Sequence, residues 1–150
     1  RIYRLSHPKI PVSHPVKILI DTNIVLDLIL EREPFVESAI ALFEQIERVN
    51  LEGYIAATTI TNIFYIIRKT EGREVALAAI HRLLTGLRFC AVDRQIVETA
   101  LGLGLKDFED SIQLACATLD RLDAIVTRDR KDFIGSNLPI YSPTELLNQL

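Results

Sequence analysis

The feature that most constrains the fold of this chain is a short apolar run that ends in polar residues. Residues 17–23 read KILIDTN, so the aliphatic side chains stop where Asp21 begins, and residues 24–30 (IVLDLIL) follow with apolar side chains at helical spacing. This pattern predicts a buried strand that ends at Asp21 and a helix that begins directly after it. In an open α/β sheet, ligands bind at the carboxyl ends of the strands. Asp21 is therefore either a helix cap or a functional carboxylate.

The alternation of strands and helices continues along the chain. Further strands are expected at residues 54–57, 87–92, 124–126 and 140–141, with helices between them, and Gly53 is expected to mark a turn before the first of these. Parallel strands need long crossover connections, which helices supply. The sequence thus predicts an α/β fold with a parallel sheet and helices on both of its faces.

Composition sets wide bounds on function. A chain of 150 residues, 49% of them hydrophobic, fits one domain with a single core. No apolar run approaches the roughly 18–20 residues that cross a bilayer. The net charge of −3 does not indicate a general nucleic-acid-coating protein, but acids clustered in a metal site would also make a nuclease acidic. Cys90 and Cys116 form no metal-binding motif and are expected to be buried, reduced thiols of a cytoplasmic protein.

The first residues differ in character from the rest. The chain contains no Met and begins with Arg1, which indicates that it is not an intact translation product. Residues 1–15 contain Pro8, Pro11 and Pro15 and no acidic residue, so we expect them to be a loosely ordered N-terminal extension. The domain itself is expected to span residues 16–150.

Four polar residues should meet at one edge of the sheet. Asp21 and Asp129 follow predicted strands, Asn62 lies in the first turns of the helix after the second strand, and Asp110 lies in the first turn of another helix. In parallel α/β units the helix N-termini share an edge with the strand C-termini, so these side chains should converge. Carboxylates held together raise each other's pKa unless a cation compensates, and oxygen ligands suit Mg²⁺ or Mn²⁺. Such an ion promotes the hydrolysis of a phosphodiester.

Four short motifs at these positions resemble those of the PIN domain family. They are KILIDTN at 17–23, ATTITNIFY at 57–65, DFED at 107–110 and VTRDRKDF at 126–133. The resemblance covers nearly all of residues 16–150 and implies a PIN-like three-layer sandwich with a five-stranded parallel sheet. It also implies a cytoplasmic ribonuclease that depends on Mg²⁺ or Mn²⁺ and binds RNA, with no membrane partner. Many members are VapC-like toxins that form dimers and are held inactive by an antitoxin, so an antitoxin and a homodimer are the expected partners.

The motifs also assign roles to individual residues. By resemblance, Asp21, Asp110 and Asp129 match metal-binding acids, and we expect Asn62 to complete the catalytic group. The residues expected to contact the substrate or to support the ligands are Asn23, Thr127, Asp107 and Arg128. Arg128 belongs to a group of cations that an RNA backbone entering the acidic edge would meet.

Asn62 departs from the family pattern, which usually has Glu at this position. A neutral amide oxygen in place of a carboxylate should weaken metal binding, and Asp107 and Glu109 are the candidates to supply the missing charge. Two functions of different class follow. One is a metal-dependent ribonuclease, and the other is a PIN-fold module with weakened catalysis that binds RNA or a protein.

The acids and the arginine also have purely structural interpretations. Asp21 would cap the following helix, Asp110 would be an acid that interacts with a helix dipole, and Asp129 would form a turn. Asp107 is better explained as a helix cap than as a metal ligand. Asp132 is better explained as a loop or cap residue than as a metal ligand. Arg128 would belong to a solvated charged face.

Overall fold

The structure, a computed structural model, describes residues 14–48 and 51–150, so residues 1–13 of the predicted extension lie outside the described residues. Strands and helices alternate as the sequence predicts. In chain order the elements are β1 (Val16–Ile20), α2 (Thr22–Ile29), α3 (Val36–Glu47), β2 (Leu51–Ala56), α4 (Thr59–Glu71), α5 (Arg73–Gly86), β3 (Arg88–Cys90), α6 (Arg94–Leu103), α7 (Phe108–Leu119), β4 (Ala124–Val126), η1 (Arg130–Phe133), β5 (Ile140–Tyr141) and α8 (Pro143–Leu147).

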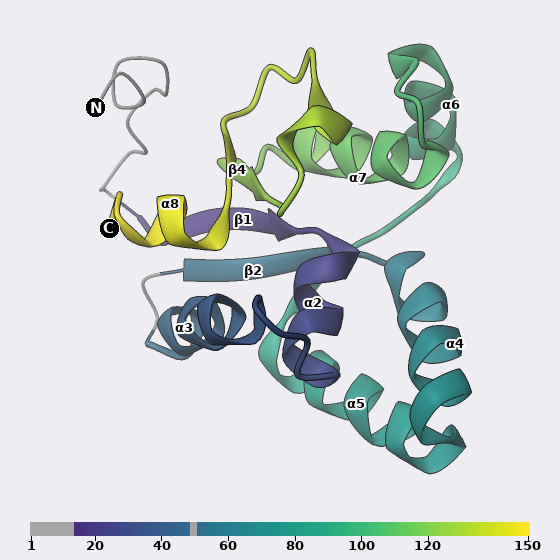
Figure 1. Ribbon diagram of the computed structural model, residues 1–150. Helices are drawn as coiled ribbons and strands as arrows, with labels where there is room; N and C mark the ends of the chain where they lie inside the picture. The colour runs from purple at the N-terminus through teal and green to yellow at the C-terminus, as the bar shows by residue number, and fades with distance from the viewer. Residues whose placement is uncertain (1–13, 49–50) are drawn as a thin grey trace.

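The strands form one five-stranded parallel sheet in the order β3-β2-β1-β4-β5 (Figure 1). The strand β1 lies at its centre, where Ile18 pairs with Gly53 of β2 on one side and with Ala124 of β4 on the other. A central parallel strand is buried on both faces, which explains why the apolar run before Asp21 does not alternate with polar residues. The predicted fold class is confirmed.

Alternate residues of β1 pack into two different cores. Ile18 and Ile20 belong to the core shared with α2, α3, α4, α5 and α8, whereas Leu19 belongs to the core shared with α6, α7 and η1. All three side chains are fully buried. Successive side chains of a strand point to opposite faces, so a single strand holds both cores. Helices therefore lie on both faces of the sheet (Figure 1), and the predicted three-layer sandwich is confirmed.

The ends of β1 and β4 are joined at the edge where the site was predicted. The backbone N–H of Asp21 donates to the carbonyl oxygen of Val126 at 3.0 Å, so Asp21 and Thr127 leave the sheet side by side. The helix α7 begins at the same edge, and the carboxylate of Asp107 accepts from the backbone N–H of Asp110 at 3.1 Å as its N-cap. The cap interpretation of Asp107 is thus confirmed.

Gly53 does not mark the turn that was predicted for it but lies inside β2, which begins at Leu51. A Cβ atom at position 53 would lie between 2.8 and 2.9 Å from side-chain methyl carbons of Leu87, Ile20 and Ile46. Residue 53 has no side chain, so Ile46 of α3, Ile20 of β1 and Leu87, which follows α5, pack their methyl groups against its backbone. Close packing, and not chain reversal, explains this glycine.

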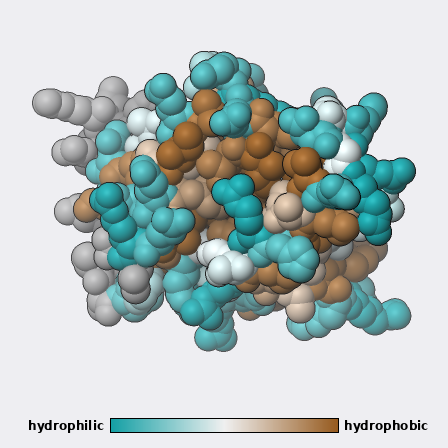
Figure 2. All heavy atoms as spheres, turned by 90° about the horizontal axis from the view of Figure 1, so that it is seen from below, coloured by the Kyte–Doolittle hydropathy of each residue, from teal (hydrophilic) through white to brown (hydrophobic). Residues whose placement is uncertain are grey.

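The face opposite α6 and α7 carries many apolar side chains, as Figure 2 shows. A hollow of about 250 Å³ lies there between α2, α3 and α5, and Ile40 on its wall is 43% exposed.

No helix among the described residues is long and apolar enough to cross a membrane. Cys90 and Cys116 are both buried, as predicted.

We expect Gly53→Ala to lower the free energy of unfolding by about 1–3 kcal/mol, because an added methyl group overpacks this core. Gly102→Ala is the matched control, since a Cβ at position 102 in α6 meets nothing within 4 Å. Ala is favoured over Gly inside a helix, so this control should be neutral or stabilising. Chemical denaturation of both variants measures the difference. Equal stabilities would contradict the packing role of Gly53.

Candidate metal and active site

A pocket of about 440 Å³ opens at the predicted edge of the sheet, between the N-termini of α2, α4 and α7. It contains five of the residues expected from the sequence. The residues that line it are Asp21, Thr22, Asn23, Leu26, Asn62, Tyr65, Ile66, Asp107, Glu109, Asp110 and Asp132. Five of these eleven are acidic, and none is basic.

Asp21 forms the floor of the pocket and is only 5% exposed. It occupies the N-cap position of α2, but its side chain makes no capping hydrogen bond. Its Oδ2 accepts from the hydroxyl of Thr127 at 2.8 Å, and its Oδ1 accepts from Nε2 of Gln113 at 3.1 Å. Burial raises the pKa of Asp21, and these two donors partly offset that rise. The cap interpretation of Asp21 therefore fails, whereas the predicted contact with Thr127 is present.

Gln113 is a residue that the sequence analysis missed. It is fully buried in α7, and its Nε2 also donates to Oδ1 of Asp110 at 3.3 Å. A single amide group therefore joins Asp21 to Asp110. The signal that would have found it is a lone amide in the apolar run 112–117 (IQLACA), where only a partner in the interior justifies a polar side chain.

Asp110 carries the clearest electrostatic signature of the site. Burial first, and then the neighbouring charges of Asp21, Asp107, Asp132 and Glu109, raise its pKa to about 7. A carboxyl group at the N-terminus of a helix normally has a lowered pKa. Burial and the acids around Asp110 thus outweigh the helix dipole, and a cation in the pocket would relieve the repulsion between the acids.

Glu109 occupies the position next to Asn62. The amide of Asn62 donates to Oε2 of Glu109, and the hydroxyl of Thr22 donates to Oε1 of Glu109 at 2.5 Å. Glu109 reaches this position from α7, while Asn62 projects from α4. Of the two residues considered as sources of the missing charge, Glu109 is the one that contacts Asn62.

Asp129 and Asp132 both follow Thr127 at this edge, but they make different contacts. The carboxylate of Asp129 accepts from the backbone N–H of Lys131 at 3.2 Å as the N-cap of η1, and Asp129 does not line the pocket. Asp132 does line the pocket, and burial together with the charges of Asp129 and Asp21 raises its pKa. The turn interpretation of Asp129 agrees with this geometry, and its role as a metal ligand stays a prediction.

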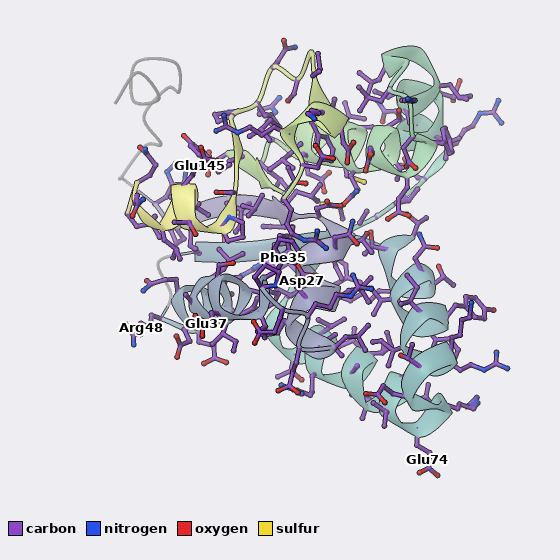
Figure 3. The ribbon with its side chains drawn as sticks, in the orientation of Figure 1. Asp27, Phe35, Glu37, Arg48, Glu74 and Glu145 are labelled. Carbon is purple, nitrogen blue, oxygen red and sulfur yellow. The ribbon has the colours of Figure 1, made fainter. Side chains whose placement is uncertain are left out.

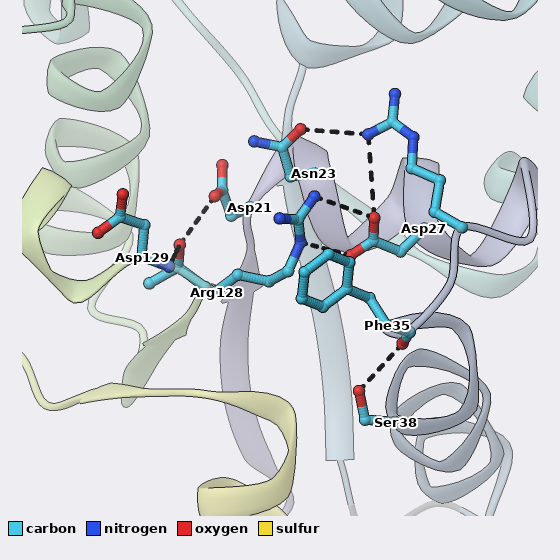
Figure 4. A network of polar contacts seen from close by, with 9 residues as sticks. Asp21, Asn23, Asp27, Phe35, Ser38, Arg128 and Asp129 are labelled. Carbon is cyan, nitrogen blue, oxygen red and sulfur yellow. Dashed lines mark hydrogen bonds and ion pairs between the residues drawn. The ribbon is translucent and has the colours of Figure 1, made fainter.

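Arg128 forms an ion pair with Asp27, an acid that was not among the predicted site residues, and its contact with a substrate stays a prediction. Its Nε and Nη2 donate to the two carboxylate oxygens of Asp27 at 2.7 and 3.1 Å, and its guanidinium lies 3.8 Å from the ring centre of Phe35 (Figure 4). The side chain of Asp27 is completely buried in α2, and it lies beside Phe35 in Figure 3. Such a bidentate pair fixes the guanidinium in place. Asp27 is the only charged residue in the apolar segment 24–30, which was its signal in the sequence.

The donor set of the pocket fits a hard divalent cation. Among residues 14–48 and 51–150, no three histidine, cysteine or acidic side chains are arranged so that they could hold one metal ion together. Asp21 and Asp110 nevertheless share one hydrogen-bond donor, and both have a raised pKa. Mg²⁺ and Mn²⁺ prefer oxygen ligands such as carboxylates, and water molecules complete their coordination shell. The residues present thus suit such an ion at this pair.

Solved structures share this fold. A toxin–antitoxin complex from Klebsiella pneumoniae contains a chain that is 26% identical, with a TM-score of 0.64 over 84% of this chain and 97% of that one. VapC20 of Mycobacterium tuberculosis, a sarcin–ricin loop cleaving toxin, has a TM-score of 0.67 at 16% identity, over 81% and 95% of the two chains. VapBC-1 of nontypeable Haemophilus influenzae has a TM-score of 0.68 at 16% identity, over 86% and 99%.

A search of curated proteins finds no match to this chain. A comparison with family profiles does find one, and it agrees with the structural comparison. The family profile described as "PIN domain" matches residues 17–131, a range that contains Asp21, the DFED segment at 107–110 and Thr127. This range covers well over half of the 150 residues. The chain belongs to the PIN domain family.

Proposed function

We propose that the protein is a Mg²⁺- or Mn²⁺-dependent ribonuclease and the toxin of a toxin–antitoxin pair. The observation that carries the proposal is the pair formed by the buried Asp21 and the half-buried Asp110, with Glu109 beside it, in a pocket without a basic residue. Family membership and the toxin–antitoxin complexes among the similar structures support the same assignment. An antitoxin, a second copy of the chain and RNA are the proposed partners.

The proposed mechanism assigns a separate task to each side chain. Asp21 and Asp110 would hold the ion, with Glu109 contributing charge, and the hydroxyl of Thr127 keeps Asp21 oriented. The ion, when bound, lowers the pKa of a water molecule and stabilises negative charge on the phosphodiester. Asn62 holds Glu109 in place through its amide and is thus a supporting residue in this scheme. Asn23 lines the open side of the pocket, where the substrate would enter.

The alternative is a PIN-fold module with weakened catalysis that binds RNA or a protein. Its basis was the loss of a charge at Asn62, and the contact between Glu109 and Asn62 favours the enzyme, because it keeps a carboxylate next to that position. Arg128 gives little support to RNA binding by this edge, since Asp27 neutralises its charge. We therefore rank the nuclease first.

Cleavage of a mixed pool of single-stranded and structured RNAs tests the function directly. We expect cleavage with Mn²⁺, none with a chelator, and none from Asp21→Asn purified in the same way, which controls for contaminating nucleases. Loss of a metal-binding carboxylate removes both charge and a ligand, so the activity should fall by at least about 100-fold. If the folded, metal-saturated protein cuts no RNA in the pool, the binding module is the better description.

A charge exchange between two helices tests the role of Glu109. We expect Glu109→Gln to weaken Mn²⁺ binding and RNA cleavage by about 10–100-fold, the usual range for residues that support a metal site. Asn62→Glu should restore most of this loss in the Glu109→Gln protein. In the wild-type protein it should give no gain, because two carboxylates would then face each other. Glu98→Gln, on the exposed face of α6, is the matched control. Unchanged binding in Glu109→Gln would contradict the compensation.

The pKa of Asp110 predicts how the stability of the metal-free protein depends on pH. Because this pKa is about 7 in the folded protein and 3.8 in a model compound, the folded state retains a proton that the unfolded chain releases. This contribution to stability is fully present below the lower pKa and is lost as the pH rises through the higher one. In chelator, the melting temperature should therefore fall between about pH 5 and about pH 8. Asp110→Asn should make the fall smaller, and Mn²⁺ should reverse it at the higher pH; an unchanged slope in Asp110→Asn would exclude this origin.

A further inference from the structure

We propose that Gln113 is a positioning residue that clamps Asp21 and Asp110 into a preorganised pair of metal ligands. The inference rests on the proposed function, because it assigns the clamp to a metal site. Its starting point is a buried amide nitrogen that lies 3.1 Å from Oδ1 of Asp21 and 3.3 Å from Oδ1 of Asp110. These two acids come from different parts of the fold, one from the end of β1 and the other from the first turn of α7.

The geometry of the amide determines how the two acids are spaced. A glutamine amide has two N–H groups, so one can serve each carboxylate. Gln113 and Asp110 are three residues apart in α7 and therefore lie on the same side of that helix. Both oxygens of Asp21 are engaged, one by Gln113 and the other by Thr127. The carboxylate of Asp21 thus has a fixed rotation, and Asp110 is held towards it despite the repulsion between their charges.

The side chain of Gln113 contains a buried polar atom that lowers the stability of the fold, and the hydrogen bonds of its N–H groups must offset this loss. Its Oε1 is buried and has no hydrogen-bond partner among the described residues, and an unpaired buried carbonyl oxygen is destabilising. Its neighbours Ile112 and Leu114 are buried apolar residues. Methionine would fill a similar volume without an unpaired polar atom. Packing alone therefore does not account for an amide at position 113, whereas two donors aimed at the two acids do.

An amide is also the suitable chemical group for this position. Lysine or arginine would donate hydrogen bonds as well, but its positive charge would neutralise the acids and compete with a metal ion. Glutamate would add a further negative charge and no donor. A neutral amide orients both carboxylates and leaves their charge available to a cation, as supporting residues of metal sites commonly do.

Calorimetric titration of the metal-free protein with Mn²⁺ tests the clamp without relying on activity. We expect Gln113→Met to weaken Mn²⁺ binding by about 10–100-fold. Gln113→Asn keeps an amide but is one methylene shorter, so it should not reach both acids and should also weaken binding. Leu114→Met is the matched control, because it changes the adjacent buried residue of α7 at similar volume, and Asp21→Asn serves as the blank. Melting temperatures in chelator, measured in parallel, show that each variant is folded.

The outcomes separate the clamp from the proposed function. If the wild-type protein binds Mn²⁺ through Asp21 and both Gln113 variants bind equally well, the clamp is overturned and the proposed function stands. A lower melting temperature with unchanged Mn²⁺ affinity would likewise overturn it, since a merely structural role predicts that result. If the wild-type protein binds no Mn²⁺, the proposed function fails, and the metal role of Gln113 fails with it.

Discussion

The rest of the site depends on one constraint, the burial of the Asp21 carboxylate at the end of the central strand. A carboxylate taken out of water must be paired, hydrogen-bonded or neutralised. Here the donors to Asp21 are uncharged: the side chains of Thr127 from the end of β4 and Gln113 from α7, and the backbone N–H of Thr22. Because the two side chains come from different layers, the position of Asp21 is coupled to the packing of β4 and α7 against β1.

The same edge contains an ion pair that keeps positive charge close to the pocket but not inside it. Asp27 holds the guanidinium of Arg128 with two hydrogen bonds, and Phe35 covers it (Figure 4). The pair ties the segment after β4 to α2, and this segment also contains Thr127. Arg128 lowers the pKa of Asp21 only as the smallest of the contributing causes. Asp27 therefore fixes the loop after β4 and neutralises the guanidinium of Arg128 outside the pocket.

What the sequence could predict was determined by local pattern, and what it could not predict depends on contacts across the fold. The limits of β4 and β5 were predicted correctly, and so was the cap Asp107, because apolar runs and cap residues are recognised within a few positions of the sequence. The convergence of acids followed from topology. The bridge from Gln113 to Asp21 spans 92 residues, and no local pattern states which side chain a buried amide will meet. The prediction for Gly53 was wrong for the same reason. A glycine can mark a turn, but it can also make room for side chains that are distant in the sequence, as it does here.

Glu109 of α7 places a carboxylate next to Asn62 of α4, the position at which the resemblance leads us to expect an acid. A metal ion responds to the field in the pocket, and that field depends on where the carboxylate ends and not on which helix carries it. An acid at position 109 is unfavourable in one respect. It is adjacent to Asp110, and its charge helps to raise the pKa of the Asp110 carboxyl group. The N-terminus of α7 offsets part of this repulsion, since its unpaired N–H groups and dipole favour negative charge. Asn62 and Thr22 offset more by donating to Glu109. An amide at position 62 donates a hydrogen bond to the acid at position 109, whereas a second acid there would repel it. Under the proposed function, Asn62 therefore supports Glu109 and is not simply a lost ligand.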